Sequence, residues 1–359
     1  MINRNLMAEQ RKIPCVLMRG GTSKGPYFLK EDLPSNDEDR DDTLLKIMGS
    51  PHPMQLDGVG GALPQTSKVA IVSLSNRDDA DIDYLFAQVM VEEQRVDVSP
   101  NCGNMLSGVA PFAIEEGLFP ALEGSTTVRI FNINTGVVVH SEVQTPKAKV
   151  TYEGAQKIDG VNGVSAPILL HFLNAEGVKT GRLFPTEKQS EYIQGLSVTL
   201  IDYSVPMMLL CGHSLELNGS ETPDEIDENK KLLKKIEEMR IEAGRRMGLG
   251  DVSQKVIPKV GILSGSEKGL LKSHYLMPHK CHKSHAITGA MCITAACYSD
   301  DTVASKLTGE ALKGSQSLSV EHPSGVIDLS VKLEESGSIQ SIAVVRTARR
   351  LFEGNVLVQ

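Results

Sequence analysis

Short apolar segments rich in Val and Ile recur along most of the chain, separated by Gly, Pro, Asn and Asp. Segments of this length, bounded by turn-forming residues, are typical of β-strands. The pattern predicts strands at Lys68–Leu74, Thr127–Ile133, Val137–Val143, Ala166–Leu173, Leu196–Ile201, Pro206–Cys211 and Val256–Leu263.

Three longer segments carry apolar residues at helical spacing, namely Asp41–Met48, Asn104–Glu116 and Ile226–Met247. In the last of these, the apolar positions fall on one stripe and Lys and Arg occupy the opposite face. Such a face could hold an anionic partner, but a solvated helix surface is the simpler interpretation. Helices and strands are mixed without a regular β–α–β alternation, which indicates an α+β fold. The polar segment Lys179–Tyr192 has no clear period and is our candidate link between two halves.

The sequence lacks the usual marks of nucleotide and nucleic-acid binding. No GxGxxG follows a predicted strand, and no GxxxxGK[ST] occurs. The 359 residues include 37 Lys and Arg against 45 Asp and Glu, so the formal net charge is −8. Trp is absent and aromatic residues make up only 4%. Because nucleic-acid binders usually show a basic surface and stacking aromatics, we expect no nucleic-acid partner.

The chain also lacks the marks of membrane insertion and of disulfide formation. No apolar run is long enough to cross a bilayer. The first residues, Met1–Cys15, lack the apolar stretch of a signal peptide. The six cysteines are irregularly spaced and contain no CxxC pair, which favours free thiols in a reducing compartment. We therefore expect a cytoplasmic protein with no membrane partner.

The segment Ser99–Gly108 (SPNCGNMLSG) is the first candidate for chemistry. Asn101 is a favourable N-cap residue, so we expect a helix that begins at Cys102. A thiol at that position faces the positive end of the helix dipole and unpaired backbone N–H groups. Both stabilise a thiolate, and the N–H groups can hold a carboxylate or an oxyanion. A buried structural cysteine is the alternative, but the flanking Pro-Asn and Gly-Asn place Cys102 at a turn.

Two Gly-rich loops contain the triplet Thr-Ser-Lys: Met18–Gly25 (MRGGTSKG) and Leu56–Val72 (LDGVGGALPQTSKVAIV). The backbone N–H groups and hydroxyls of such loops suit an anion, and Arg19 and Lys24 would add positive charge. Lys68 lies where an apolar strand begins, and loss of solvation there favours the neutral amine that a general base needs. Taken alone, a surface lysine at a strand end would be the better interpretation of Lys68.

A cluster of histidines precedes the last predicted helix. Four side chains in this cluster are of the types that bind zinc: His279, Cys281, His282 and His285. No second cluster supplies further ligands at standard spacing, so we expect no metal. The alternative is that this segment opens a second helix, Ala290–Cys297, whose start holds an anion with help from the nearby histidines.

Several motifs resemble known families. PNCGNMLSG resembles the first cysteine motif of the diaminopimelate epimerase superfamily, TGAMCITAA stands where that superfamily has its second helix, and RTARRLFEGNV resembles its closing strand. From about Ile13 to the C-terminus, MRGGTSKG, LDGVGGALPQTSKVAIV, DYLFAQV, LGDVSQKVIPK, MPHKCH and EHPSG together resemble the PrpF-type isomerases. RIFNINTG, LLCGHSLELNG and VRTARRLFEG are most similar to the branch that acts on 4-oxalomesaconate.

This resemblance implies a diaminopimelate epimerase-like fold with two similar halves. Each half would be a barrel-like sheet around a central helix, with the active site in the cleft between them. The central helices would begin near Cys102 and near Thr288. We expect an N-terminal half of residues 1–188 plus 346–359, because the last strand of the superfamily returns to the first half, and a C-terminal half of residues 189–345.

The resemblance also assigns roles to residues. Lys68 matches the family's catalytic lysine and Cys102 its catalytic cysteine. Ala286 stands where the epimerases have a second cysteine, which argues against epimerisation by two thiols. The expected substrate-binding residues are Arg19, Thr22, Ser23, Ser67, Gly103, Asn104, His279, His285, Thr288 and Gly289.

The implied activity is isomerisation of a small unsaturated polycarboxylate. The expectation is a keto–enol tautomerase or 1,3-allylic isomerase of 4-oxalomesaconate in gallate or protocatechuate breakdown, with Lys68 as the general base. Cys102 would be the partner acid/base or a positioning group. The alternatives are a 2-methylaconitate cis–trans isomerase, a methylitaconate Δ-isomerase and a non-catalytic carboxylate-binding protein. We expect no organic cofactor, no metal and, as protein partner, at most a homodimer.

Overall fold

The computed structural model describes residues 10–173, 175–277 and 279–358. The chain divides into two compact units, which we call unit 1 (Met1–His171 with Arg346–Gln359) and unit 2 (Phe172–Val345). This boundary precedes the one we placed after residue 188, so the polar segment from 179 to 192 lies within unit 2. We inspected Met1–Cys15 for a signal peptide, and residues 1–9 of that segment lie outside the described residues. Within the described ranges, no helix is both long and apolar enough to cross a bilayer.

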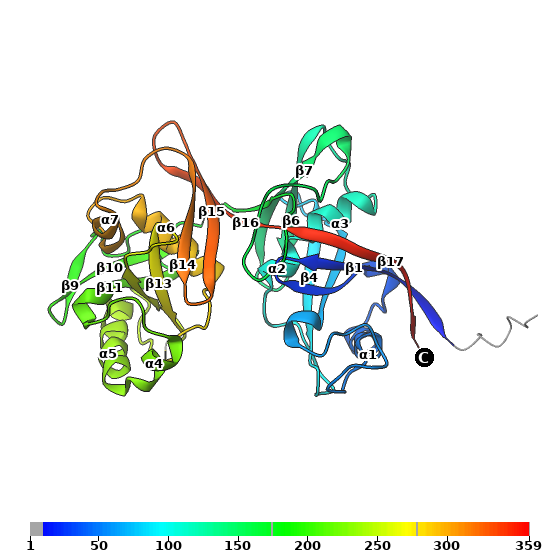
Figure 1. Cartoon of the computed structure of the whole chain (residues 1–359), viewed down its shortest axis with the longest axis horizontal. Coiled ribbons are helices and arrows are strands. Elements are labelled where there is room, and N and C mark those ends of the chain that lie inside the picture. Colours follow the sequence, from blue (N-terminus) through cyan, green and yellow to red (C-terminus); the bar gives the residue numbers. More distant parts are fainter. Residues whose placement is uncertain (1–9, 174, 278, 359) are drawn as a thin grey trace, which may run out of the picture. The chain divides into compact units, whose positions relative to one another are not determined.

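Unit 1 is built on a mixed sheet. Its strands are β1 (Arg11–Gly20), β2 (Ser23–Leu29), β3 (Lys68–Leu74), β4 (Ile82–Val89), β5 (Val96–Asp97), β6 (Gly124–Asn132), β7 (Val137–Thr145) and β17 (Ala348–Val358), while β8 (Ile168–Phe172) spans the boundary along the chain. β1 pairs antiparallel with β17 on one side and with β2 on the other. β3 runs parallel to β2 and antiparallel to β4, and β6 joins β4 in parallel. Figure 1 shows β17 beside β1, so the C-terminal segment is a strand of unit 1.

The helices of unit 1 lie on opposite faces of this sheet. They are α1 (Asp37–Met48), α2 (Gly103–Leu106) and α3 (Val109–Glu115). Successive residues of a strand point to opposite faces. Val69 and Ile71 of β3 share an apolar core with Ile47 of α1. Lys68 and Ala70 therefore face the other side, where α2 and α3 pack against β3. The fold thus directs Lys68 toward the helix that follows Cys102.

Unit 2 repeats the plan of helices on both faces of a sheet. Its strands are β9 (Glu191–Ile193), β10 (Leu196–Tyr203), β11 (Val205–Cys211), β12 (Lys259–Ser264), β13 (Leu271–Leu276), β14 (Gln316–His322), β15 (Gly325–Leu333) and β16 (Ile339–Arg346), and its helices are α4 (Pro223–Glu228), α5 (Lys230–Arg246), α6 (Ile287–Cys297) and α7 (Val303–Thr308). Nearly every side chain of α6 is buried in one apolar core. The apolar stripe of α5 fills a second core.

One expectation about the helices needs correction, while the fold class is confirmed. The helix predicted over Ile226–Met247 is two helices, because Asn229 interrupts it and its side chain caps α5 by accepting a hydrogen bond from the Leu232 N–H at 3.0 Å. The α+β class is confirmed, and each unit has a buried helix. The strand pairings described within each unit do not close into a ring, so the sheets of the described part of the chain are open.

Candidate active site

Lys68 is half-buried at the first position of β3, on the face that α2 covers. Its Nζ donates a hydrogen bond to Oε1 of Gln88 at 2.8 Å and lies 5.0 Å from the centre of the Phe86 ring. Gln88 is the direct cross-strand partner of Lys68 on β4. Phe86 and Gln88 are two residues apart in β4, so both side chains share the face of Lys68. The amine is therefore held by two neighbours on one strand.

Cys102 is the N-cap residue of α2, one position later than the Asn101 cap that we expected. Asn101 does not cap the helix, because its side-chain oxygen accepts a hydrogen bond from Asn132 at 2.7 Å. The Cys102 side chain makes no capping hydrogen bond and the residue is 9% exposed. The thiol therefore takes the place that a capping hydroxyl takes in other helices, beside the first free N–H groups.

Tyr84 links the backbone of Cys102 to the strand that contacts Lys68. Its hydroxyl donates to the backbone oxygen of Cys102 at 3.3 Å, and its ring lies on the same face of β4 as Phe86 and Gln88. The hydroxyl of Tyr27 donates to the Met105 carbonyl of α2 at 2.5 Å. Burial first, and the neighbouring Cys102 second, raise the pKa of both tyrosines. Both hydroxyls therefore remain donors, and one face of β4 carries both the Lys68 contacts and the Cys102 contact.

The first Thr-Ser-Lys loop packs directly on the start of α2. A Cβ atom on Gly20 or Gly21 would collide with the backbone or the side chain of Asn104. Gly21 also has a φ of +53°, which favours glycine. The Asn104 side-chain amide donates to the exposed Thr22 hydroxyl at 3.0 Å. This loop therefore brings Thr22 beside Gly103 and Asn104.

Glycine is also required at a second close approach. A Cβ on Gly25 would collide with the carbonyl oxygen of Lys68 and would lie 3.3 Å from Cε of Met105. β2 thus touches the start of β3 and α2 at the same point. Ser23, two residues earlier in β2, is buried. The predicted residues Thr22, Ser23, Lys68, Cys102, Gly103 and Asn104 accordingly occupy one region of unit 1.

Two predicted binding residues are engaged inside the protein. Nη1 of Arg19 donates to the backbone oxygens of Gly21 and Thr347 and to the Thr347 hydroxyl, at 2.8, 3.1 and 3.0 Å. Ser67 is completely buried, and its hydroxyl donates a hydrogen bond to Oε1 of Gln55 at 2.8 Å. Both side chains stabilise the loops that carry their neighbours, and Ser67 offers no surface to a ligand in this conformation.

In unit 2, three predicted residues meet at the start of α6. The helix begins at Ile287 after an Ala286 N-cap, next to the start near Thr288 that the resemblance implies and three residues before the alternative start at Ala290. His285 is buried, accepts or donates a hydrogen bond with Ser273 at 3.0 Å, and has its pKa lowered to about 3 by burial. It is therefore neutral at physiological pH. A Cβ on Gly289 would lie 3.0 Å from Cε1 of His285, and Thr288 is half-buried beside it.

His279 does not belong to that group. Its side chain is 66% exposed, with Nδ1 3.8 Å from a carboxylate oxygen of Glu237. The Sγ of Cys281 lies against the backbone oxygen of His282 at 3.8 Å. Across the described residues, no three His, Cys, Asp or Glu side chains are arranged to hold a metal ion. The arrangement around His279 thus gives the zinc interpretation no support.

The sequence reasoning missed Tyr27, Tyr84 and Gln88. The motif DYLFAQV contained a usable signal, because its alternate residues Tyr84, Phe86 and Gln88 must share one face of a strand. His322 of the EHPSG motif was also missed: its ring centre lies 6.4 Å from that of His285. No local pattern marks Tyr27 as a partner of α2, because the two are far apart in the sequence.

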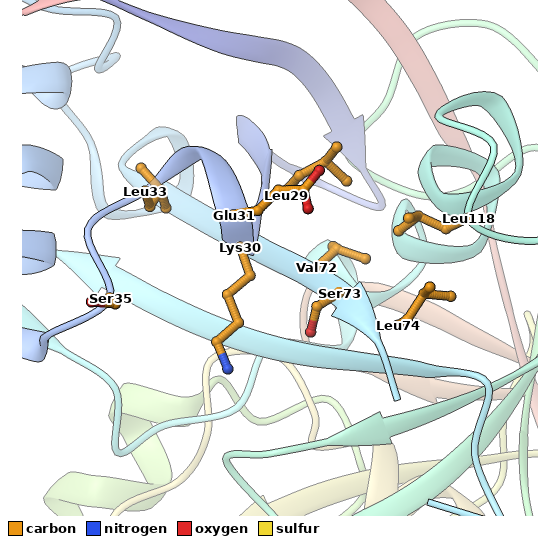
Figure 2. A pocket seen from close by; sticks show the side chains of 9 residues that line it. All are labelled: Leu29, Lys30, Glu31, Leu33, Ser35, Val72, Ser73, Leu74 and Leu118. Carbon is orange, nitrogen blue, oxygen red and sulfur yellow. The ribbon is translucent and has the colours of Figure 1, made fainter. Parts of the chain in front are cut away.

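A separate cavity of about 450 Å³ lies in unit 1 at the far end of β3 (Figure 2). Its lining is mostly apolar and includes Leu29, Leu33, Val72, Leu74 and Leu118, together with Lys30, Glu31, Ser35 and Ser73. Lys68 and Leu74 are the two ends of β3. None of the predicted site residues lines this cavity, and its apolar wall does not suit a polycarboxylate.

Comparisons with known proteins agree on one family. The family model described as PrpF protein matches residues 10–359. The chain is 48% identical over 348 residues to the protein YbhH of Escherichia coli K12, covering 96% of this chain and 99% of that protein. It is 45% identical over 350 residues to 4-oxalomesaconate tautomerase of Pseudomonas putida, covering 97% of each. The crystal structure of methylitaconate-delta-isomerase matches with a TM-score of 0.85 and 35% identity, covering 98% of this chain and 96% of that one.

Proposed function

The chain belongs to the PrpF family and is an isomerase, and on that basis we propose that its substrate is 4-oxalomesaconate. The reaction is the conversion of the keto form to its enol or to the 1,3-allylic isomer, within the breakdown of gallate or protocatechuate. The relative named for this substrate shares 45% of its residues with the chain, whereas the methylitaconate isomerase of known structure shares 35%. The RIFNINTG, LLCGHSLELNG and VRTARRLFEG motifs support the same assignment.

The chemistry of this substrate suits a single general base. In 4-oxalomesaconate a methylene carbon lies between a keto group and a conjugated double bond, so loss of one proton leaves a delocalised dienolate. Return of a proton to oxygen gives the enol, and return to the distal carbon shifts the double bond. General acid–base catalysis of such a transfer contributes roughly 10²–10⁴ in rate. No redox step and no external reactant is required for this conversion.

The observation that carries the proposal is the shared face of β4 in unit 1. Tyr84 on this face contacts the Cys102 backbone, while Phe86 and Gln88 contact the Lys68 amine. We assign Lys68 as the base that removes the proton and Cys102 as the group that returns or positions it. Thr22, Gly103 and Asn104 beside them are assigned to the substrate carboxylates.

Methylitaconate is the second candidate substrate, favoured by the structural match with a TM-score of 0.85. The test compares kcat/KM for 4-oxalomesaconate, methylitaconate and 2-methylaconitate under one set of conditions. We expect 4-oxalomesaconate to be preferred by at least about tenfold, which corresponds to about 1.4 kcal/mol in transition-state binding. A preference of that size for either other substrate would overturn the assignment.

The same proposal includes the setting of the enzyme. We place the reaction in the cytoplasm, where the six free cysteines are compatible with a reducing environment. We propose no organic cofactor and no metal, because a proton transfer between two positions of one substrate needs neither. A homodimer remains a prediction, which light scattering of the purified chain would test.

A further inference from the structure

We propose that Gln88 is a positioning residue for Lys68, an inference that rests on the proposed function and adds a residue to its machinery. Oε1 of Gln88 accepts a hydrogen bond from Nζ of Lys68 at 2.8 Å. This contact occupies one N–H of the amine. The lone pair of the neutral amine must then point elsewhere, which restricts the direction from which a substrate C–H can approach.

The orientation of the Gln88 amide is fixed by its other end. Nε2 donates to the backbone oxygens of Ser67, Pro64 and Val89 at 2.9, 3.1 and 3.4 Å. All three partners are acceptors, so only the NH₂ group can face them. A flipped amide would place Oε1 against these carbonyl oxygens and lose all three hydrogen bonds to the backbone. The carbonyl oxygen of the side chain is therefore the atom presented to Lys68.

Hydrogen bonds to neighbouring residues also fix the position of Ser67. Its hydroxyl donates to Oε1 of Gln55 at 2.8 Å, and Gln55 also accepts from the Ala62 N–H at 2.9 Å. Ser67 and Gln55 are both almost completely buried. The backbone carbonyl oxygen of Ser67 accepts hydrogen bonds from the Val89 N–H at 3.1 Å and from the side chain of Gln88. A continuous series of hydrogen bonds thus links Gln55, Ser67, Gln88 and Lys68, and gives Ser67 a supporting role in place of substrate contact.

The neutral charge of this partner matters for a base. A carboxylate at position 88 would stabilise the ammonium form of Lys68, which cannot accept a proton. It would also set negative oxygen against three backbone carbonyls. An amide keeps the amine oriented without fixing its charge by an ion pair. The site therefore favours Gln over Glu, although the two side chains have nearly the same shape.

In the reaction, the substrate C–H bond breaks as a new N–H bond forms on Lys68, and the electron pair of the broken bond enters the dienolate. Gln88 takes no proton and touches no substrate in this step. It holds the amine before and after the transfer, so its loss should reduce kcat more than it changes KM. A misplacement of about 1 Å in a reacting group costs on the order of 10² in rate.

The test uses the full chain with Gln88→Glu and Gln88→Met, and measures kcat, KM and the pH dependence of kcat/KM on 4-oxalomesaconate. Gln144→Glu is the matched control, because Gln144 is a half-buried strand glutamine on β7 of the same unit. We expect Gln88→Met to lower kcat about ten- to a hundredfold with KM within about threefold. The acid limb of the profile should move to lower pH, since the ammonium form loses an acceptor. Gln88→Glu should move this limb to higher pH by about one unit or more.

The control variant should keep both the rate and the limb of the wild type. Equal activity of both Gln88 variants and the wild type would overturn the inference, and so would a loss of activity at every pH with the acid limb unmoved. Failure of the proposed function gives a different result, since the wild type itself would then prefer another polycarboxylate. The same variants assayed on that substrate would still decide the role of Gln88.

Discussion

Helix α2 of unit 1 and helix α6 of unit 2 begin in contrasting ways. In unit 1, α2 has only four residues, starts at the thiol of Cys102 and is held by the hydroxyls of Tyr27 and Tyr84. In unit 2, α6 has eleven residues, starts after Ala286 and lies next to the buried ring of His285. One start carries a thiol and packs against β3, the strand that begins with Lys68. The other start carries a methyl group and a histidine that burial keeps neutral.

This difference is one of the chemistry that each helix start can offer. The groups of unit 1 can exchange protons, whereas those at the start of α6 can offer neutral hydrogen-bond donors and helix N–H groups. The epimerases use a second cysteine, and at the position that the family resemblance aligns with it this chain has Ala286, whose methyl group cannot exchange a proton. An isomerase that moves a proton along one face of an unsaturated acid needs acid/base groups at only one helix start. The asymmetry is therefore consistent with tautomerisation and with an allylic shift.

The largest expected effect is on kcat, and it follows from replacing Lys68 of unit 1. Lys68→Met should lower kcat by at least about 10², because the amine that we propose as the base is lost while the apolar stem of the side chain is kept. Product binding, measured by titration calorimetry, should stay within a few-fold. Solvent deuterium exchange into the substrate should stop as well.

Lys46→Met is the matched control for this variant. Lys46 is an exposed lysine of α1 that pairs with Asp42 at 2.9 Å, on the other face of the sheet. Its loss should leave kcat within about twofold. If Lys68→Met retained activity within tenfold of the wild type, Lys68 would not be the base.

A smaller effect is expected for the rate at which the Cys102 thiol is alkylated. Burial raises the pKa of Cys15, Cys281 and Cys297 to about 12, and that of Cys292 still further, so these four stay protonated near neutral pH. Alkylation at pH 7.5 should therefore label Cys102 ahead of those four. Saturating substrate should slow the labelling of Cys102 at least about tenfold, as peptide mapping would show.

Cys211 provides the internal reference for this experiment. It is a half-buried free thiol of unit 2 at the end of β11. Substrate should leave its rate of labelling unchanged if protection reflects occupation of the site near Cys102. Equal protection of both thiols would instead indicate a general stabilisation of the fold, and labelling of Cys281 or Cys292 before Cys102 would contradict the assignment.

The sequence predicted the framework of this comparison more closely than its contacts. The apolar run Lys68–Leu74 is β3 residue for residue, because turn-forming residues bound a continuous buried segment there. Cys102 was correctly placed at a helix start, but its N-cap position was not, since Asn101 bonds to Asn132 from a distant strand. Local propensity cannot anticipate such a competitor.

The same limit applies to the polar neighbours of Lys68. Ser67 precedes Lys68 in the sequence, which suggested a ligand-binding hydroxyl, yet its hydrogen bond to Gln55 turns the hydroxyl inward. Gln88 lies twenty positions away and is brought to Lys68 only by the register of β3 with β4. Strand register is a long-range property, so a single sequence gives the residues of such a site without their pairing.

The smallest expected effect tests the neutral side of the comparison, and it is one of stability. Burial lowers the pKa of His285 to about 3, so the folded chain keeps it neutral while the unfolded chain binds a proton below about pH 6.5. The unfolded state then holds more protons, and stability must fall as the pH drops from 6.5 toward 3. Between pH 6.5 and pH 5 this loss in the free energy of unfolding is about 2 kcal/mol, at about 1.4 kcal/mol per pKa unit.

His285→Asn should therefore flatten the decrease of the denaturation midpoint over this range. His279→Asn, which alters an exposed histidine, should leave the slope as it is in the wild type. If both variants kept the full slope, the charge-neutral start of α6 would have no part in the acid sensitivity of the fold, and the contrast between the two helix starts would rest on the thiol alone.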